Sequence, residues 1–379
     1  MRCRIGILQP EIPHYRTEFF ERLSQQCDVM DLYVYNRLED TRKHGFDVND
    51  NLNLHVNYIT NKNVHEVLTY SPLPLLSKRY DTLVLMLHFA HVTTWLLLLT
   101  KWLHRKRIIL WGQGISVKRY LKETVKPDWK LKWMIALADG AWIYEEPEAE
   151  QWKRIFPKKP IVALNNTLTG VEEMLEFNGN ESGLQLTVDS LRGNKDEIKK
   201  KWGITQEVVL IFCARFDNDY RRPDLLVEAM ERLDKGKYGF IIIGDGKNKP
   251  DFSRFPNVHD FGAVYDSTKK RELFAVADIY FQPGWVGLSI VEAMAYGKPV
   301  FTFRRSEQTL QCVEYCYIKE GENGLIFDDM EDFVRQMNVV TKERIMQMGE
   351  QARLLVKEKL TPRKMVERAI SVLVLSGEF

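Results

Sequence analysis

The sequence lacks the features of several protein classes. Its five cysteines, at positions 3, 27, 213, 312 and 316, are too few and too scattered for a disulfide framework or a four-cysteine zinc site. The formal net charge is only +2, so the overall charge does not indicate a nucleic-acid partner. No apolar run reaches the roughly 18 residues of a membrane-spanning helix, and the first strand begins at about residue 4, which leaves no room for a signal peptide. We therefore expect a cytoplasmic protein in a reducing setting.

What is present is a regular alternation of short apolar runs with amphipathic stretches. With 379 residues, 45% of them apolar, the chain is long enough for two domains. Runs that we expect to be strands cover residues 4–8, 30–35, 82–87, 107–111, 140–144 and 160–164, and then 208–213, 238–243, 258–261, 278–282, 299–303 and 325–327. The alternation predicts an α/β fold with two parallel sheets, each covered by helices on both faces. Ligands of such sheets bind at the carboxyl ends of the strands.

The alternation of apolar runs and amphipathic stretches ends near Gly170. A polar stretch, Glu176–Gly183, and a basic helix, Lys195–Trp202, follow before the strands resume. We expect the first domain at residues 1–170 and a second at 171–362, with 171–205 as the connecting segment.

Residues 281–300 have the order strand, glycine-interrupted loop, short helix, strand. Gly284 and Gly287 allow a ligand close to the backbone, and a helix that starts near Leu288 would direct its N–H groups at an anion. Glu292 follows one helical turn later, where a carboxylate can accept hydrogen bonds from a ribose. The pattern predicts a diphosphate site, and the alternative is a plain crossover helix with its glutamate in solvent.

Arginines follow the strand at 208–213. Arg215 comes directly after it, and Arg221 and Arg222 precede the helix that begins at Pro223. Guanidinium groups bind diphosphate oxygens bidentately and can neutralise the charge of a leaving nucleotide. The alternative is a solvated arginine loop. Asp217 and Asp219, spaced like a pair of metal ligands, are interpreted as turn residues, and we expect no metal and no cofactor.

Both segments resemble the signature of the family 4 glycosyltransferases, of GT-B fold, and of their bacterial cell-surface polysaccharide type. In Gly-Arg-Leu…Lys-Gly-x-Asp-Leu-Leu, Arg215 matches the arginine and Arg221 the lysine. In the second motif, two glutamates separated by seven residues flank a Gly-Phe-Gly-Leu loop; Gly287-Leu288 matches the loop end and Glu292 the second glutamate. Gly284 stands where the family has its first glutamate, which lies near the donor sugar.

The resemblance implies two doubly wound Rossmann-like domains facing a central cleft, an acceptor-side domain at 1–170 and a donor domain at 171–362, with a C-terminal helix, 363–379, packing back on the first. It also implies transfer of a hexose from a UDP- or GDP-linked donor to a hydroxyl of a glycan or lipid-linked sugar, with retention and without metal. The implied diphosphate-binding residues are Arg215, Arg221, Gly284, Gly287 and Leu288, with Glu292 on the ribose and Val264 on the nucleobase.

On the acceptor side, the loop after the first strand resembles that of some bacterial members, which would place His14 and Arg16 beside the acceptor; a helix-capping loop is the alternative. Gln113 ends another strand and can position a sugar but cannot act as a base near neutral pH. His88 and His91 follow a third strand and are either titratable groups or packing residues. We assign no catalytic base.

Two segments, at 95–107 and 118–133, combine tryptophan with lysine and arginine. This combination suits the surface of a membrane rich in anionic lipid, at the inner face of the cell membrane. The alternative is a helix that covers the sheet and has a solvated basic end. Two other functions stay open. One is a nucleotide-sugar epimerase of the same fold. The other is a non-catalytic nucleotide-sugar binding protein, for which the glycine at position 284 in place of the family's first glutamate is the argument.

Overall fold

The computed structural model describes residues 3–36, 54–65, 67–113, 128–176 and 188–374. Residues 118–127 of the second basic segment and most of the polar stretch Glu176–Gly183 lie outside this part of the chain. The chain forms two compact units: an N-terminal unit, Met1–Thr169 with Lys359–Phe379, and a C-terminal unit, Gly170–Glu358. From the sequence we expect divisions after residues 170 and 362, and the assignment of an acceptor side and a donor side to these units stays a prediction.

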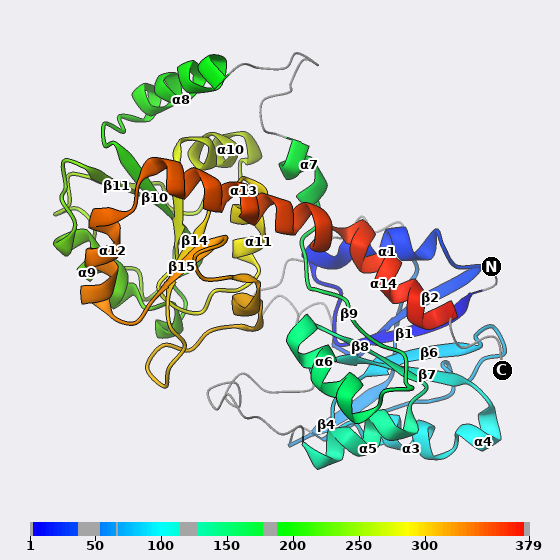
Figure 1. Ribbon diagram of the computed structural model, residues 1–379. Helices are drawn as coiled ribbons and strands as arrows, with labels where there is room; N and C mark the ends of the chain where they lie inside the picture. Colours follow the sequence, from blue (N-terminus) through cyan, green and yellow to red (C-terminus); the bar gives the residue numbers. More distant parts are fainter. Residues whose placement is uncertain (1–2, 37–53, 66, 114–127, 177–187, 375–379) are drawn as a thin grey trace. The chain divides into compact units, whose positions relative to one another are not determined.

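The N-terminal unit contains a seven-stranded sheet in which every pairing is parallel (Figure 1). Its strands in spatial order are β3 (Val56–Tyr58), β2 (Val29–Val34), β1 (Arg4–Gln9), β6 (Thr82–Met86), β7 (Arg107–Gly112), β8 (Gly140–Ile143) and β9 (Ile161–Ala163). The central strands are continuous apolar runs because helices cover both faces. An antiparallel hairpin, β4 (Asn61–Val64) and β5 (Val67–Tyr70), stands apart from the sheet. The sequence analysis missed β3 and this hairpin, whose strands are only three or four residues long; β4 is polar and exposed, but β5 buries Leu68 and Tyr70.

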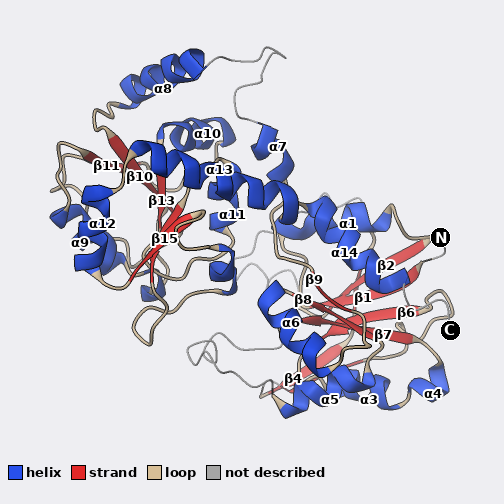
Figure 2. Ribbon diagram, viewed as in Figure 1, coloured by secondary structure: helices blue, strands red, loops and turns tan. Residues whose placement is uncertain are grey.

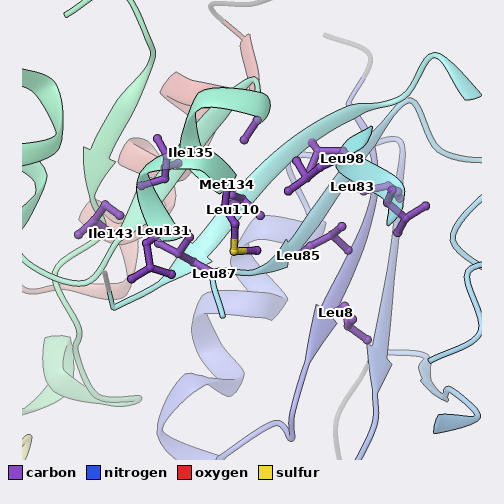
Figure 3. Packing of buried hydrophobic residues seen from close by; sticks show 14 of the residues in the cluster. Leu8, Leu83, Leu85, Leu87, Leu98, Leu110, Leu131, Met134, Ile135 and Ile143 are labelled. Carbon is purple, nitrogen blue, oxygen red and sulfur yellow. The ribbon is translucent and has the colours of Figure 1, made fainter. Parts of the chain in front are cut away.

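Helices cover the two faces of this sheet as two separate layers. On one face, η1 (His14–Arg16), α1 (Thr17–Ser24) and α14 (Pro362–Val374) enclose a core that contains Phe19, Trp111, Trp142 and Ala369. The last helix packs on α1, β8 and β9. On the other face lie α3 (Val92–Leu99), α4 (Lys101–His104), α5 (Trp129–Leu137) and α6 (Glu146–Ile155), and Figure 3 shows the packing beneath them.

The C-terminal unit has a six-stranded parallel sheet (Figure 2). Its strands in spatial order are β12 (Val258–Asp260), β11 (Tyr238–Ile243), β10 (Val208–Cys213), β13 (Ile279–Phe281), β14 (Val300–Phe303) and β15 (Gly324–Phe327). The helical segments are α7 (Val171–Glu176), α8 (Val188–Trp202), η3 (Asp219–Arg221), α9 (Pro223–Arg232), α10 (Ser267–Val276), α11 (Ser289–Ala295), η4 (Val313–Tyr317), α12 (Met330–Val339) and α13 (Lys342–Lys359).

Both sheets are doubly wound. In the N-terminal unit the chain proceeds from β1 outward to β2 and β3 and then returns to the other side of β1. In the C-terminal unit it proceeds from β10 to β11 and β12 and returns to β13. This order confirms the predicted α/β class with two Rossmann-like domains, and the cleft between them stays a prediction. In such a sheet the crevice for a ligand lies where the order reverses, here between β10 and β13.

Helix α13 packs tightly against the end of α11 through two glycines. A Cβ atom added to Gly349 would lie 2.2 Å from the carbonyl oxygen of Gly297. The absence of a side chain at Gly349 therefore permits this packing.

The substitution Gly349→Ala tests this contact. Alanine favours a helix by about 1 kcal/mol over glycine, but an approach of 2.2 Å to a backbone oxygen cannot be relieved by moving a side chain, so we expect the clash to cost about 3 kcal/mol. We expect a lower melting temperature in a thermal denaturation experiment, whereas Glu350→Ala, at the exposed neighbouring position, should not lower it. An unchanged melting temperature for Gly349→Ala would contradict the close packing.

Candidate functional site

Two loops meet at the reversal point of the C-terminal sheet. One follows β10 and includes residues 214–222, and the other follows β13 and includes residues 282–288. A Cβ atom added to Gly284 would lie 2.4 Å from the carbonyl oxygen of Tyr220 and 2.8 Å from Cγ of Arg222. The two loops are thus packed backbone to backbone, and only glycine fits at position 284.

This packing explains how the chain departs from the family motif. A glutamate at position 284 would need the Cβ position that Tyr220 excludes. On either side of this contact, Tyr220 and Trp285 stack their aromatic rings with the centroids 5.3 Å apart. Trp285 has a φ of 50°, in the left-handed region that favours glycine. The sequence analysis did not identify this aromatic pair.

Arg222 is the second residue of these loops with a left-handed backbone, at a φ of 54°. It stands where the family motif has the glycine after its lysine. Its Nη1 donates a hydrogen bond of 2.6 Å to Oγ1 of Thr309, and its Nε donates one of 2.9 Å to Asp224. These contacts hold Arg222 as a structural residue that joins the loop to helix α9.

Two buried amide side chains hold the β13 loop. Nε2 of Gln282 donates to the carbonyl oxygens of Gly284, at 3.1 Å, and Trp285, at 2.6 Å. Oε1 of Gln311 accepts a hydrogen bond of 2.9 Å from the backbone N–H of Val286. Both side chains are fully buried, so their amides are committed to shaping the loop. Gln282 had a signal in the sequence, as a polar residue at the end of an apolar run, whereas Gln311 had none.

Glu292 is buried on α11 and forms an ion pair with Lys270 of α10, with Oε2 at 2.7 Å from Nζ. Burial by itself lowers the pKa of Lys270, but the neighbouring Cys213 and Glu292 raise it to about 12. Burial raises the pKa of the Cys213 thiol to about 12, so that this thiol is neutral near pH 7. The carboxylate is therefore the group that holds the lysine charged, and Lys270 fixes one oxygen of Glu292.

Helix α11 contains seven residues, and its first turn already uses some of its N–H groups. The N–H groups of Ile290 and Val291 donate to the carbonyl oxygens of Gly287 and Leu288, at 3.1 and 3.0 Å. The helix start is thus a weaker anion site than the sequence suggests. The interpretation as a diphosphate site depends mainly on the arginines of the other loop.

Arg221 lies at the end of η3 and is half-buried. Its Nη1 is buried and has no hydrogen-bond acceptor among the described residues. Burial lowers the pKa of Arg221, but an arginine keeps its charge in proteins. A buried donor that lacks an acceptor costs about 1 to 3 kcal/mol. Arg215 is exposed, with Nε at 3.4 Å from Asp217.

The acidic residues of this loop do not form a metal site with other described side chains. Asp217 pairs with Arg215, and Oδ1 of Asp219 accepts a hydrogen bond of 2.6 Å from Asn248. Across the described ranges, no three histidine, cysteine, aspartate or glutamate side chains converge on one point.

The loops after β11 and β12 lie at the same edge of the sheet as the β10 loop, because all these strands are parallel. Hydrogen bonds connect the three loops. The backbone N–H of Phe216 donates to the carbonyl oxygen of Asp245, at 2.9 Å. The Asp245 carboxylate accepts from the N–H of Ala263, at 2.8 Å. Val264 follows and is half-buried, and its role at a nucleobase stays a prediction.

In the N-terminal unit, His14 is exposed but Arg16 is buried. The Arg16 guanidinium lies over the rings of Trp111 and Tyr144, at 5.2 and 5.1 Å from their centroids. Gln113 is half-buried after β7. An acceptor role for these residues stays a prediction, and Arg16 also has a structural role in the core.

His91 is buried, with 5% of its surface exposed, and its ring lies 4.8 Å from that of His88 and 5.7 Å from that of Tyr35. Burial, followed by the charge of His88, lowers the pKa of His91 to about 4. It is therefore neutral near pH 7, which fits a packing role.

Comparisons with known proteins concern the fold and the C-terminal unit. Residues 207–343, within the C-terminal unit, match the model of the family Glycosyl transferases group 1. No curated protein sequence is significantly similar to the chain. A solved glycosyltransferase from Rickettsia africae has a TM-score of 0.59 at 14% identity, over 100% of both chains.

Two further structures are similar over nearly their whole length. The lipopolysaccharide outer core galactosyltransferase WaaB has a TM-score of 0.59 at 12% identity and covers 97% of this chain and 98% of its own. A protein from Listeria monocytogenes named for UDP-N-acetylglucosamine 2-epimerase has 0.55 at 10% identity, over 100% of this chain and 97% of its own. At such identities the likeness concerns the fold, which is the predicted GT-B fold. The match to the family Glycosyl transferases group 1 lies wholly within the C-terminal unit.

Two alanine substitutions in the β13 loop should differ in their effect on stability. Gly284→Ala places a Cβ atom against the oxygen of Tyr220, whereas at Gly287 the nearest atom is 4.0 Å away. We expect Gly284→Ala to lower the free energy of unfolding by about 1 to 3 kcal/mol and Gly287→Ala to leave it nearly unchanged, as measured by urea denaturation. Equal losses in the two variants would contradict the packing of the loops.

The buried His91 should make stability depend on pH. Its pKa is about 4 in the folded protein against an ordinary value of 6.5. The unfolded chain therefore takes up the proton first, and stability that is complete above pH 6.5 is lost as the pH falls toward 4. The loss amounts to about 3 kcal/mol. His91→Gln should remove this part of the pH dependence in melting experiments, and His14→Gln, at an exposed position, should retain it. If the melting temperatures of the wild type and of His91→Gln fell equally between pH 6.5 and pH 4, the lowered pKa of His91 would be contradicted.

Proposed function

We propose that this protein is a glycosyltransferase that moves a hexose from a UDP- or GDP-linked donor to a hydroxyl of a glycan or lipid-linked sugar. The observation that carries the proposal is Arg221, a half-buried arginine whose buried Nη1 has no acceptor among the described residues. It lies at the reversal point of a doubly wound sheet, where nucleotides bind. A diphosphate would supply both the missing acceptor and the opposite charge.

The remaining roles follow from positions around Arg221. Arg215, on the same loop, is exposed and can add a second guanidinium to the diphosphate. The β13 loop, with Gly284, Gly287 and Leu288, is held by Gln282 and Gln311 and would form the opposite wall. Glu292 would accept hydrogen bonds from the ribose. Val264 would contact the base.

In the proposed reaction, the bond between the anomeric carbon and the β-phosphate oxygen breaks, and a bond to the acceptor oxygen forms. The acceptor proton would pass to the leaving phosphate, so no side chain is needed as the base. Arg215 and Arg221 would stabilise the charge that grows on the nucleoside diphosphate. Retention, independence from metal and an acceptor side at His14, Arg16 and Gln113 rest on the family resemblance.

An epimerase is the second candidate, because an epimerase-named protein has nearly the same TM-score as the transferases. The fold therefore does not separate the two activities, and the family match over residues 207–343 favours transfer. A product assay separates them: transfer needs an added acceptor and releases nucleoside diphosphate, whereas epimerisation keeps the nucleotide sugar intact and needs no acceptor.

The first test is thermal denaturation with saturating UDP, GDP, TDP or ADP. A ligand at about 100 times its dissociation constant adds roughly 2.7 kcal/mol of stability, which raises the melting temperature by several degrees. We expect one nucleotide to produce this shift and Arg221→Ala to lose it. Arg254→Ala removes an exposed arginine paired with Glu231 and should keep the shift.

The unliganded variant offers a second readout. Because Arg221→Ala removes a buried donor that lacks an acceptor, it should not lower the melting temperature of the free protein. A loss of the nucleotide shift in a variant of undiminished stability supports direct binding. No shift of the wild type with any nucleotide would refute the proposed function.

A further inference from the structure

One face of the N-terminal unit exposes an unusual amount of apolar surface. Helices α3 and α5 lie on the same side of the sheet, where Leu97, Leu98, Leu131, Met134 and Ile135 pack into a common core (Figure 3). Since their inner sides point to the sheet, their outer sides belong to one surface. Helix α4 follows α3 directly, and Figure 1 shows the three helices in one layer.

We define the α3–α5 face by the apolar side chains that these helices expose: Leu96, Leu99, Trp102, Leu103, Trp129 and Trp133, each more than half exposed. The three tryptophans are exposed by 76%, 66% and 60%. The chain has nine tryptophans, and Trp111, Trp142 and Trp152 are fully buried in this same unit. Such a concentration of large apolar side chains marks an interaction surface.

The charges on this face have one sign. The segments Val92–His104 and Trp129–Leu137 contain lysines but no acidic residue. Nζ of Lys130 lies 4.8 Å from the centroid of Phe89 and 5.8 Å from that of Trp129, so that charge and aromatic rings are in direct contact. Lys132 of α5 and Arg105, which follows α4, are also exposed. Asp139, just beyond α5, is paired with Lys101 at 2.6 Å.

These observations select the partner. Tryptophan with lysine is the combination that occupies the headgroup region of a bilayer, because the ring buries apolar area while the charge meets lipid phosphates. A second copy of the same face would place lysines opposite lysines. In the described part of the chain no helix is long and apolar enough to cross a membrane, so the contact would be peripheral.

We propose that the α3–α5 face docks this protein onto a bilayer that contains anionic lipid, with the three tryptophans in the interfacial region and Lys130 and Lys132 on the phosphates. The binding does not depend on the proposed transferase activity. If that activity holds, docking would keep the enzyme at the surface that carries a lipid-linked acceptor.

The experiment is flotation of the full chain with vesicles of phosphatidylcholine alone or of phosphatidylcholine with phosphatidylglycerol, at fixed salt. The wild type should float with the anionic vesicles. The variant Trp102→Ser/Trp129→Ser/Trp133→Ser should bind at least about tenfold more weakly, because it removes most of the buried apolar area. Lys130→Gln/Lys132→Gln should lose about fivefold for each lysine.

The matched control is Val339→Ser/Met346→Ser, which removes comparably exposed apolar side chains from the C-terminal unit and should float as the wild type does. Unchanged melting temperatures would show that the tryptophan variant is folded, since its substitutions are at exposed sites. Its nucleotide-induced melting shift should also match that of the wild type, which separates this proposal from the proposed function.

Three results would overturn the proposal. The first is a wild type that does not bind anionic vesicles, and the second is equal binding by the tryptophan variant. The third is a wild type that sediments as a dimer without lipid while the tryptophan variant sediments as a monomer. The face would then be a subunit interface. A blue shift of tryptophan fluorescence on anionic vesicles, absent in the tryptophan variant, would support insertion of these rings.

Discussion

The contact between the backbone of the β10 loop and that of the β13 loop is the constraint on which the candidate site depends. Because Gly284 lies against the carbonyl oxygen of Tyr220, the two loops pack together with no room for a side chain between them. The contact excludes a side chain at the place of the family's first glutamate, and it leaves Tyr220 and Trp285 stacked beside it. Arg221 lies in the β10 loop, and its buried Nη1, which has no acceptor among the described residues, is the strongest indication of an anionic ligand.

The site is supported from behind by groups that sequence motifs do not reveal. Gln282 and Gln311 commit their amides to the backbone of the β13 loop, and Lys270 commits its charge to Glu292. A loop shaped in this way before the ligand arrives loses little conformational entropy on binding. The strained residues Arg222 and Trp285 persist for the same reason, since their surroundings determine the backbone more strongly than their own preferences.

The two units use their surfaces differently. In the C-terminal unit, the candidate binding residues lie in loops at the carboxyl ends of the strands. A hydrogen bond from the N–H of Ala263 to the Asp245 carboxylate joins two of these loops. In the N-terminal unit, one sheet face is closed by α1 and α14, while the helices on the other face bury leucines inward and expose tryptophans outward. A helix that is apolar on both sides needs a second apolar partner, and the flanking lysines indicate the chemistry of that partner.

The sequence by itself determined the α/β class, the two domains and the strands of both sheet centres, because buried parallel strands are continuous apolar runs that local patterns reveal. Through a motif it also pointed to Arg221 and Glu292, whose roles at a donor stay predictions. It missed β3 and the hairpin β4/β5, whose strands of three or four residues are too short to show such a pattern. Only the tertiary structure decided that position 284 must be glycine, that Arg16 and His91 are buried, and that Gln311 supports the β13 loop. These facts depend on contacts between residues far apart in the chain, and no local pattern of residues encodes them.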